Sequence, residues 1–121
     1  MIVGIGVDVV DIARFERALS RTPRLCDRLF TAGEQAQGER MLPLRSLAGR
    51  FAAKEALIKA LGDSTGVQWH DIRVVTDSHG NPSFELLGAV KAIVAGRGIS
   101  AVHLSMSHDA GIAVAYVVAE S

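Results

Sequence analysis

The chain begins with a run of apolar and mostly β-branched residues, Ile2 to Val10, which Gly4 and Gly6 interrupt. Val and Ile fit the pleated surface of a sheet, so this run predicts a strand. Glycine inside a strand often marks a place where another part of the chain approaches closely. We therefore expect a first strand over 2–10 with a close neighbour at its glycines.

The pattern then changes to helical spacing, with apolar residues at positions 12, 15, 18 and 19. This spacing predicts a helix over 12–21, which Pro23 should end. Further along the chain, Thr31 and Glu34 form the T-x-x-E signature of a capping box. A short helix should therefore begin at Thr31.

The strongest helical pattern runs from Arg45 to Leu61, before Gly62, which can cap a helix. In the C-terminal half, turn-forming residues separate the apolar runs, which predicts two hairpins with a short helix between them. The expected elements are strands over 72–76 and 83–87, a helix over 89–95, and strands over 101–107 and 112–118. Because strands and helices do not alternate regularly, we favour an α+β fold with a mainly antiparallel sheet and a long central helix.

Length and composition limit the classes of protein to which the chain can belong. Its 121 residues suit a single domain over 1–121, and its formal net charge of zero argues against a nucleic-acid-binding domain. Cys26 is the only cysteine, so no internal disulfide can form. The longest apolar run, 112–119, is too short to span a membrane, and the N-terminus lacks the basic start of a signal peptide. We therefore expect a cytoplasmic protein.

Two acidic residues stand out because they lie in apolar elements. On a helical wheel, Glu55 falls at the edge of the apolar stripe of the long helix, among mostly small residues. One interpretation is a surface ion pair with Lys59, one turn further on, worth only about a few tenths of a kcal/mol.

Asp8 favours a second interpretation. Acidic residues are uncommon in strands, and Asp11 is better placed than Asp8 to cap the helix that begins near Ile12. Mg²⁺ is typically held by one or two carboxylates together with phosphates and waters. Asp8 and Glu55 are therefore candidate ligands of Mg²⁺ or Mn²⁺. A dinucleotide-binding fingerprint is excluded, because Val9 stands where its third glycine is required.

Five short segments carry a resemblance that covers essentially the whole chain. They are Gly4-Ile5-Gly6-Val7-Asp8-Val9-Val10, Arg50-Phe51-Ala52-Ala53-Lys54-Glu55-Ala56 with Lys59, Trp69-x-Asp71-Ile72, Gly80-Asn81-Pro82, and His103-Leu104-Ser105-Met106-Ser107-His108. In this order and spacing they resemble the holo-(acyl carrier protein) synthase family of 4′-phosphopantetheinyl transferases. The block around Glu55 is the specific part of the resemblance, since a strand with glycines and an aspartate is common.

The resemblance implies transfer of 4′-phosphopantetheine from coenzyme A to a serine of an apo acyl carrier protein, in support of fatty acid biosynthesis. Adenosine 3′,5′-bisphosphate would be released. Asp8 and Glu55 match the metal-binding acids of the family, and Lys59 matches a lysine near the pyrophosphate. The positions that would line the nucleotide end of coenzyme A are Arg50, Gly80, Asn81, Pro82 and His108. The family commonly forms homotrimers with active sites between subunits.

One loop departs from the family pattern. After Leu61, relatives usually have Gly-Thr-Gly with a further glycine, whereas this chain has Gly62-Asp63-Ser64-Thr65-Gly66. We therefore assign no role to any residue of this loop.

Phosphoryl transfer depends mainly on positioning and charge neutralisation. Lys59 could reach a phosphate oxygen while Glu55 holds the metal, whereas protonation of the leaving group by Lys59 ranks below this role. The base for the serine hydroxyl is either Glu55 or a metal-bound water. Strand alternation places His103 and His108 on opposite faces of one strand. A structural role is the more common one for a histidine and is expected for His103, whereas the resemblance favours His108 as a phosphate contact.

The first helix is basic on one face, where Arg14, Arg17 and Arg21 are spaced three and four residues apart. Such a face is often only a solvated surface. Acyl carrier proteins are acidic, however, and the resembling family docks them on this helix. We therefore expect Arg14 and Arg21 to contact the carrier.

Two other classes of function remain open at this point. A non-catalytic module that binds coenzyme A or a nucleotide would not need both acids, so Glu55→Gln should leave it functional. A structural assembly subunit would show an apolar oligomer face but no metal-dependent ligand binding. Leu57 lies off the main apolar stripe of its helix and indicates a second buried contact, which fits a trimer or a structural subunit equally.

Overall fold

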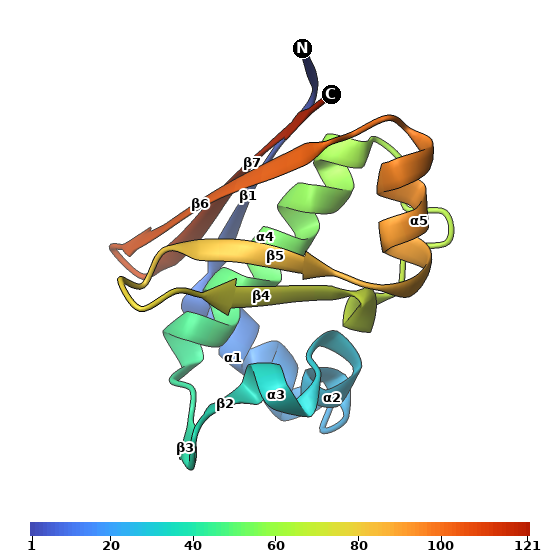
Figure 1. Ribbon diagram of the computed structural model, residues 1–121. Coiled ribbons are helices and arrows are strands. Elements are labelled where there is room, and N and C mark those ends of the chain that lie inside the picture. Colours follow the sequence, from blue (N-terminus) through green and yellow to red (C-terminus); the bar gives the residue numbers. More distant parts are fainter.

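The computed structural model describes all 121 residues, from Met1 to Ser121. It confirms the expected α+β fold, in which antiparallel sheets surround a long central helix (Figure 1). In chain order the elements are β1 (Ile2–Asp11), α1 (Ile12–Arg21), α2 (Leu25–Leu29), α3 (Ala32–Gln35), β2 (Ala36–Gln37), β3 (Arg40–Met41), α4 (Leu44–Leu61), η1 (Trp69–Asp71), β4 (Ile72–Thr76), β5 (Pro82–Leu86), α5 (Gly88–Gly96), β6 (Ala101–Asp109) and β7 (Ile112–Glu120).

The main sheet has three strands in the order β1-β7-β6, and both pairings are antiparallel. Strand β7 therefore lies in the centre, although it comes last in the chain. Its alternate residues, such as Ala115 and Val117, are fully buried against α4, whereas Tyr116 between them is exposed. The sheet thus has one face on the core and one open face, as alternation in an antiparallel sheet predicts.

The glycines of β1 allow α4 to lie directly on the sheet. A Cβ atom added to Gly6 would stand 1.8 Å from the carbonyl oxygen of Ala56, and one added to Gly4 would stand 2.1 Å from that of Ala60. Both distances are far below van der Waals contact, so no side chain fits at either position. The expected close neighbour of the first strand is therefore the backbone of the central helix.

Helix α4 is enclosed on more than one side, which explains its weak amphipathic pattern. The main sheet covers one side, and the hairpin β4–β5 lies across another (Figure 1). Leu57 is consequently 0% exposed inside this chain. The second buried contact that we predicted for Leu57 is therefore confirmed. The second layer of the same molecule supplies it, so the assignment of this contact to an oligomer interface is wrong.

The N-terminal helices follow the capping signals of the sequence. The Asp11 carboxylate accepts a hydrogen bond of 2.9 Å from the backbone N–H of Arg14, which confirms Asp11 as the N-cap of α1. Helix α1 ends at Arg21, two residues before Pro23, and Thr31 opens α3 with the predicted capping box. The sequence patterns missed α2 and the small hairpin β2–β3, which are too short to show a period. No helix has both the length and the apolar character needed to cross a membrane.

Candidate active site

The predicted acids and lysine meet where β1 lies beside α4. The Lys59 Nζ atom donates to the Asp8 carboxylate over 3.0 Å and to the carbonyl oxygen of Val7 over 3.1 Å. Glu55, one turn before Lys59 on α4, makes no ion pair with it. The alternative of a surface Glu55–Lys59 pair is therefore not what the fold adopts, because the sheet offers Lys59 a closer partner.

Glu55 lies in an environment that disfavours its charge. Partial burial raises the pKa of Glu55, the negative charge of Asp8 raises it further, and Lys59 opposes both effects. Two carboxylates that repel each other in this way could hold a cation between them. Their oxygens suit Mg²⁺ or Mn²⁺, which prefer hard oxygen donors. The protein contains no cluster of three or more metal-binding side chains, so a metal here would take its other ligands from substrate phosphates and water.

A cleft of about 840 Å³ extends from these residues. Asp8, Glu55 and Lys59 form its polar end, and Arg14 of α1 lies on its border. Asp11 also lines the cleft, and the rest of its wall is apolar. The residues of this apolar wall are Val9, Val10, Phe15, Ala18, Leu25, Leu29, Phe51, Trp69 and Ile112. The cleft therefore joins a charged centre to an apolar surface built largely by α1, α2 and η1.

Three aromatic rings support the apolar wall, and the sequence patterns did not assign them to the site. The rings of Phe15 and Phe51 are stacked with centroids 5.3 Å apart, and Phe51 and Trp69 are 5.8 Å apart. Such spacing is typical of favourable aromatic pairs. One sequence pattern could have assigned Phe51 to the site: it stands four residues before Glu55, so the two side chains share one face of α4.

The residues expected at the nucleotide end lie elsewhere. Arg50 and His108 line a separate hollow of about 130 Å³ together with Arg45, Ser46, Gly49, Met106 and Ser107. Arg50 precedes Glu55 by five residues, which places it about 140° around the helix axis. The two groups of predicted residues therefore lie on different sides of α4 within one chain. The positions of Arg45 and the two serines came from the structure alone.

Burial also disfavours the positive charge of Arg50. Desolvation lowers the pKa of Arg50, and the nearby Glu34 carboxylate opposes that effect. The Nε atom of Arg50 is buried without a hydrogen-bond partner. This guanidinium is therefore partly desolvated, which strengthens its attraction for an anion.

The turn from Gly80 to Pro82 forms the tip of the β4–β5 hairpin and borders neither cavity. Its shape depends on Asp77, whose carboxylate accepts from the backbone N–H of His79 over 2.8 Å and of Asn81 over 2.9 Å. Gly80 has a φ of 81°, a conformation that favours glycine. In one chain, this turn is therefore separate from the acids around Glu55.

The remaining predicted residues take different positions. Arg14 borders the cleft, whereas Arg21 is exposed in the last turn of α1 and outside it. His103 is exposed on the open face of the main sheet, where its Nε2 atom lies 3.0 Å from a carboxylate oxygen of Glu120. This pairing agrees with the structural role expected for His103.

Comparison with known proteins adds an independent finding. A family model described as the 4′-phosphopantetheinyl transferase superfamily matches residues 4–117. The chain is 62% identical over 120 residues to a holo-[acyl-carrier-protein] synthase of Clavibacter sepedonicus, covering 99% of this chain and 97% of that one. Among solved structures, the synthase of Neisseria meningitidis is similar with a TM-score of 0.89, 36% identity and full coverage of both chains. The Helicobacter pylori synthase in complex with coenzyme A has a TM-score of 0.83 at 32% identity, covering 96% of this chain and 99% of that one.

Proposed function

The chain belongs to the 4′-phosphopantetheinyl transferase superfamily, and on this premise we propose that Asp8, Glu55 and Lys59 form its reaction centre. The enzyme transfers the phosphopantetheine group of coenzyme A to apo acyl carrier protein. The observation that carries the assignment of the centre is the contact between Lys59 and Asp8, beside a Glu55 whose pKa is raised. These three charged groups all line the cleft of about 840 Å³.

The reaction needs a nucleophile, a leaving group and a route for one proton. The hydroxyl oxygen of the carrier serine attacks the β-phosphorus of coenzyme A, and the bond from that phosphorus to the bridging oxygen breaks. Adenosine 3′,5′-bisphosphate leaves with the bridging oxygen, and the serine proton is released. When bound, Mg²⁺ or Mn²⁺ would polarise the phosphorus and offset the charge that develops on the leaving phosphate.

The residues of the chain divide these tasks by charge and position. Asp8 and Glu55 supply the oxygen ligands for the metal. Lys59 leaves its contact with Asp8 and neutralises a phosphate oxygen, which a cation on a long, half-exposed side chain can do. The base that takes the proton of the serine hydroxyl is either Glu55 or a metal-bound water. Positioning and charge neutralisation are the main contributions that phosphoryl transfer requires of a protein.

We propose that the nucleotide end of coenzyme A binds in the hollow of Arg50 and His108 of a neighbouring chain, together with the hairpin tip Gly80, Asn81 and Pro82. Within one chain, about 140° of helix α4 separate Arg50 from Glu55. A single coenzyme A molecule would contact both groups readily if each came from a different subunit. This geometry supports an active site between subunits.

The open face of the main sheet supports an interface between subunits, as the homotrimer implied by the family resemblance requires. Large apolar residues of β1 and β7 are exposed there, namely Val3, Ile5, Val7, Val9, Ile112 and Tyr116. A contiguous apolar patch on a sheet typically marks an interaction surface. The same face carries the His103–Glu120 pair, so a partner there would bury both apolar and polar groups.

Three further assignments complete the proposal. Arg14, on the border of the cleft, and Arg21 contact the acidic carrier and orient its serine toward Glu55. The pathway that the enzyme serves is fatty acid biosynthesis. The enzyme acts in the cytoplasm, since its single cysteine is free and suits a reducing compartment.

The test is intact-mass analysis of an apo acyl carrier protein incubated with this enzyme and coenzyme A. We expect a gain of one phosphopantetheine unit with Mg²⁺, and no gain after a chelator is added. Separate replacements Asp8→Asn, Glu55→Gln and Lys59→Met should each abolish the gain. A carrier that is modified equally well by Glu55→Gln would contradict the proposed centre, and binding of coenzyme A without transfer would favour a binding module.

A further inference from the structure

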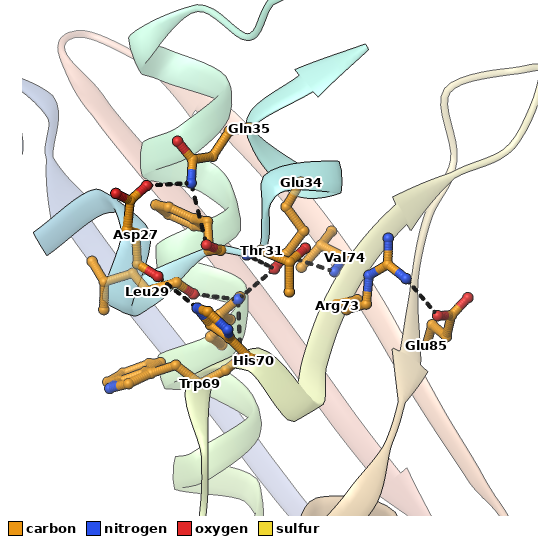
Figure 2. A network of polar contacts seen from close by, with 12 residues as sticks. Asp27, Leu29, Thr31, Glu34, Gln35, Trp69, His70, Arg73, Val74 and Glu85 are labelled. Carbon is orange, nitrogen blue, oxygen red and sulfur yellow. Dashed lines mark hydrogen bonds and ion pairs between the residues drawn. The ribbon is translucent and has the colours of Figure 1, made fainter. Parts of the chain in front are cut away.

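A fully buried lysine lies next to the proposed centre and has no part in it so far. Lys54 is 0% exposed, and its Nζ atom donates to the Glu34 carboxylate over 2.9 Å. The same atom donates to the backbone carbonyl oxygens of Leu29 over 2.5 Å and of Trp69 over 3.1 Å. The three acceptors come from α2, α3 and η1, and Figure 2 shows Leu29, Glu34 and Trp69 gathered around one point. The three donors of the ammonium group are therefore all used.

Glu34 is equally well fixed. Its Oε1 atom also accepts from the backbone N–H of Thr31 over 3.0 Å, which closes the capping box of α3. Its Oε2 atom accepts from the backbone N–H of Val74 over 3.3 Å. The pair thus joins the segment 29–34, the long helix, η1 and β4 at a single point (Figure 2).

Stability is a weak explanation for such a pair. Replacing a buried ion pair by apolar residues of similar volume is often neutral or stabilising, because both charges lose their hydration. A buried pair does fix geometry, since its hydrogen bonds are satisfied in only one arrangement. The question is therefore which geometry Lys54 fixes.

The two carbonyl groups that Lys54 holds belong to residues of the cleft wall. Leu29 and Trp69 both line the cleft, and the Trp69 ring lies against Phe51 of α4. Lys54 itself directly precedes Glu55 on α4. One side chain therefore links the helix that carries the acid to the opposite wall of the same cleft.

We propose that Lys54 is a positioning residue that holds the Leu29 and Trp69 wall at a fixed distance from Glu55. This inference rests on the proposed function, because the cleft between Arg14 and Glu55 is the route by which the carrier serine reaches the acids. Glu34 serves as the counter-charge that keeps Lys54 charged in the interior. Lys54 thus acts through the cleft wall and touches neither substrate.

Trp69 allows a direct test, because it is the only tryptophan of the chain. In Lys54→Met, which keeps the volume but removes all three donors, we expect the emission of Trp69 to shift to longer wavelength and acrylamide to quench it more strongly. The KM for the apo carrier should rise about tenfold or more, while the KM for coenzyme A changes less than about twofold. Circular dichroism must show that the variant remains folded.

The matched control changes the acidic partner of Lys54 instead of the lysine itself. Glu34→Gln keeps an acceptor for Lys54 and leaves the bonds to Leu29 and Trp69 in place. It should lower the melting temperature but leave the emission of Trp69 and the KM for the carrier close to the wild type. A rise in the carrier KM equal to that of Lys54→Met would overturn the proposal.

The double variant Lys54→Met with Glu34→Gln separates geometry from stability. It no longer leaves a charged carboxylate unpaired in the interior, so its melting temperature should recover part of the loss. The emission shift and the raised carrier KM should persist, because both carbonyl groups still lack a donor. If the melting temperature, the emission of Trp69 and the KM for the carrier all returned to wild-type values, Lys54 would be only the counter-ion of Glu34. The emission is measured without substrates, so it tests the wall even if the wild-type enzyme proves inactive as a transferase.

Discussion

Single residues of β1 determine how closely the sheet and the central helix approach. Gly4 and Gly6 leave no room for a Cβ atom, since the carbonyl oxygens of Ala60 and Ala56 occupy that space. The next inward-facing residue of the same strand is Asp8, which meets Lys59 of α4. The absence of side chains at the glycines therefore brings the strand near enough for the charged residues to meet.

Replacing Gly6 by alanine should consequently separate β1 from α4. We expect a loss in the free energy of unfolding of about 3 kcal/mol or more, because the obstacle is backbone and cannot change rotamer. The matched control is Gly96→Ala at the end of α5, where nothing lies within 4 Å of the added Cβ. This control should be neutral or stabilising by up to about 1 kcal/mol. Urea denaturation measures both, and equal effects would contradict the argument.

Glu55, which we propose as a metal ligand, reduces the stability of the fold when it is charged. Its folded-state pKa lies above the ordinary value, so the folded state binds more protons than the unfolded state in the pH range between the two values. Stability therefore falls as the pH rises through that range. At neutral pH and without metal, the wild type retains the whole cost of the charged carboxylate.

Glu55→Gln should accordingly be more stable than the wild type at pH 7 in the presence of a chelator. We expect a gain of no more than about 1 kcal/mol, because water screens a half-buried charge. The gain should shrink toward pH 4, where the wild-type carboxylate is largely protonated. Adding Mg²⁺ should stabilise the wild type alone, by about 2.7 kcal/mol at a hundred times its Kd. Urea denaturation at the two pH values measures this, and a pH-independent difference would count against the prediction.

At the scale of elements, α1 carries basic residues beside the cleft. Phe15 is buried on the inner side of the helix, Arg14 borders the cleft, and Arg21 is exposed in the last turn. The Asp11 cap sets where the helix begins and therefore which residues face the cleft. A short, well-capped helix thus presents its positive charges at one edge of the site.

Reversing the charges of Arg14 and Arg21 to glutamate should raise the KM for the carrier about tenfold or more. The KM for coenzyme A should change little, and the effect should weaken at high salt, because surface charges are screened. The control is the reversal of Lys91 and Arg97, which are exposed at α5 and line neither cavity. It changes the net charge equally, so an equal effect on the carrier KM would indicate general charge and no specific docking.

At the scale of the whole molecule, the two groups of site residues point to an assembly. One group surrounds Glu55, and the other includes Arg50 and His108 on another side of α4. The open sheet face provides the apolar surface on which copies of the chain could associate. A complete site would then require two chains.

Mixing two inactive variants should therefore restore activity. Glu55→Gln lacks the acid, and the double variant Arg50→Ala with His108→Ala lacks the proposed nucleotide contacts. In mixed trimers some sites would combine an intact acid with an intact nucleotide hollow. After the variants are unfolded and refolded together, we expect about a tenth or more of the wild-type rate. No recovery in mixtures that native mass spectrometry shows to contain mixed trimers would mean that both groups act within one chain.

Local sequence patterns determined most of the elements. The cap at Asp11, the capping box at Thr31 and the alternation in β6 and β7 act between near neighbours, so they can be recognised without a fold. The resemblance carried by the segments around Asp8 and Glu55 also identified the family that the comparisons show. The pattern predicted a second buried contact at Leu57 but not its partner, because the second layer over α4 comes from residues far along the same chain.

The amino-acid sequence by itself determined the elements, the family and the types of residue available for catalysis. Only the tertiary structure decided which of them meet: that Lys59 pairs with Asp8 and not with Glu55, that Arg50 faces a different hollow, and that Lys54 is buried against Glu34. Local spacing fixes the face of a helix on which a residue lies. Long-range packing decides which residue it meets there. In this protein, the glycines of β1 let α4 lie against the sheet, and the loops around α4 supply its other neighbours.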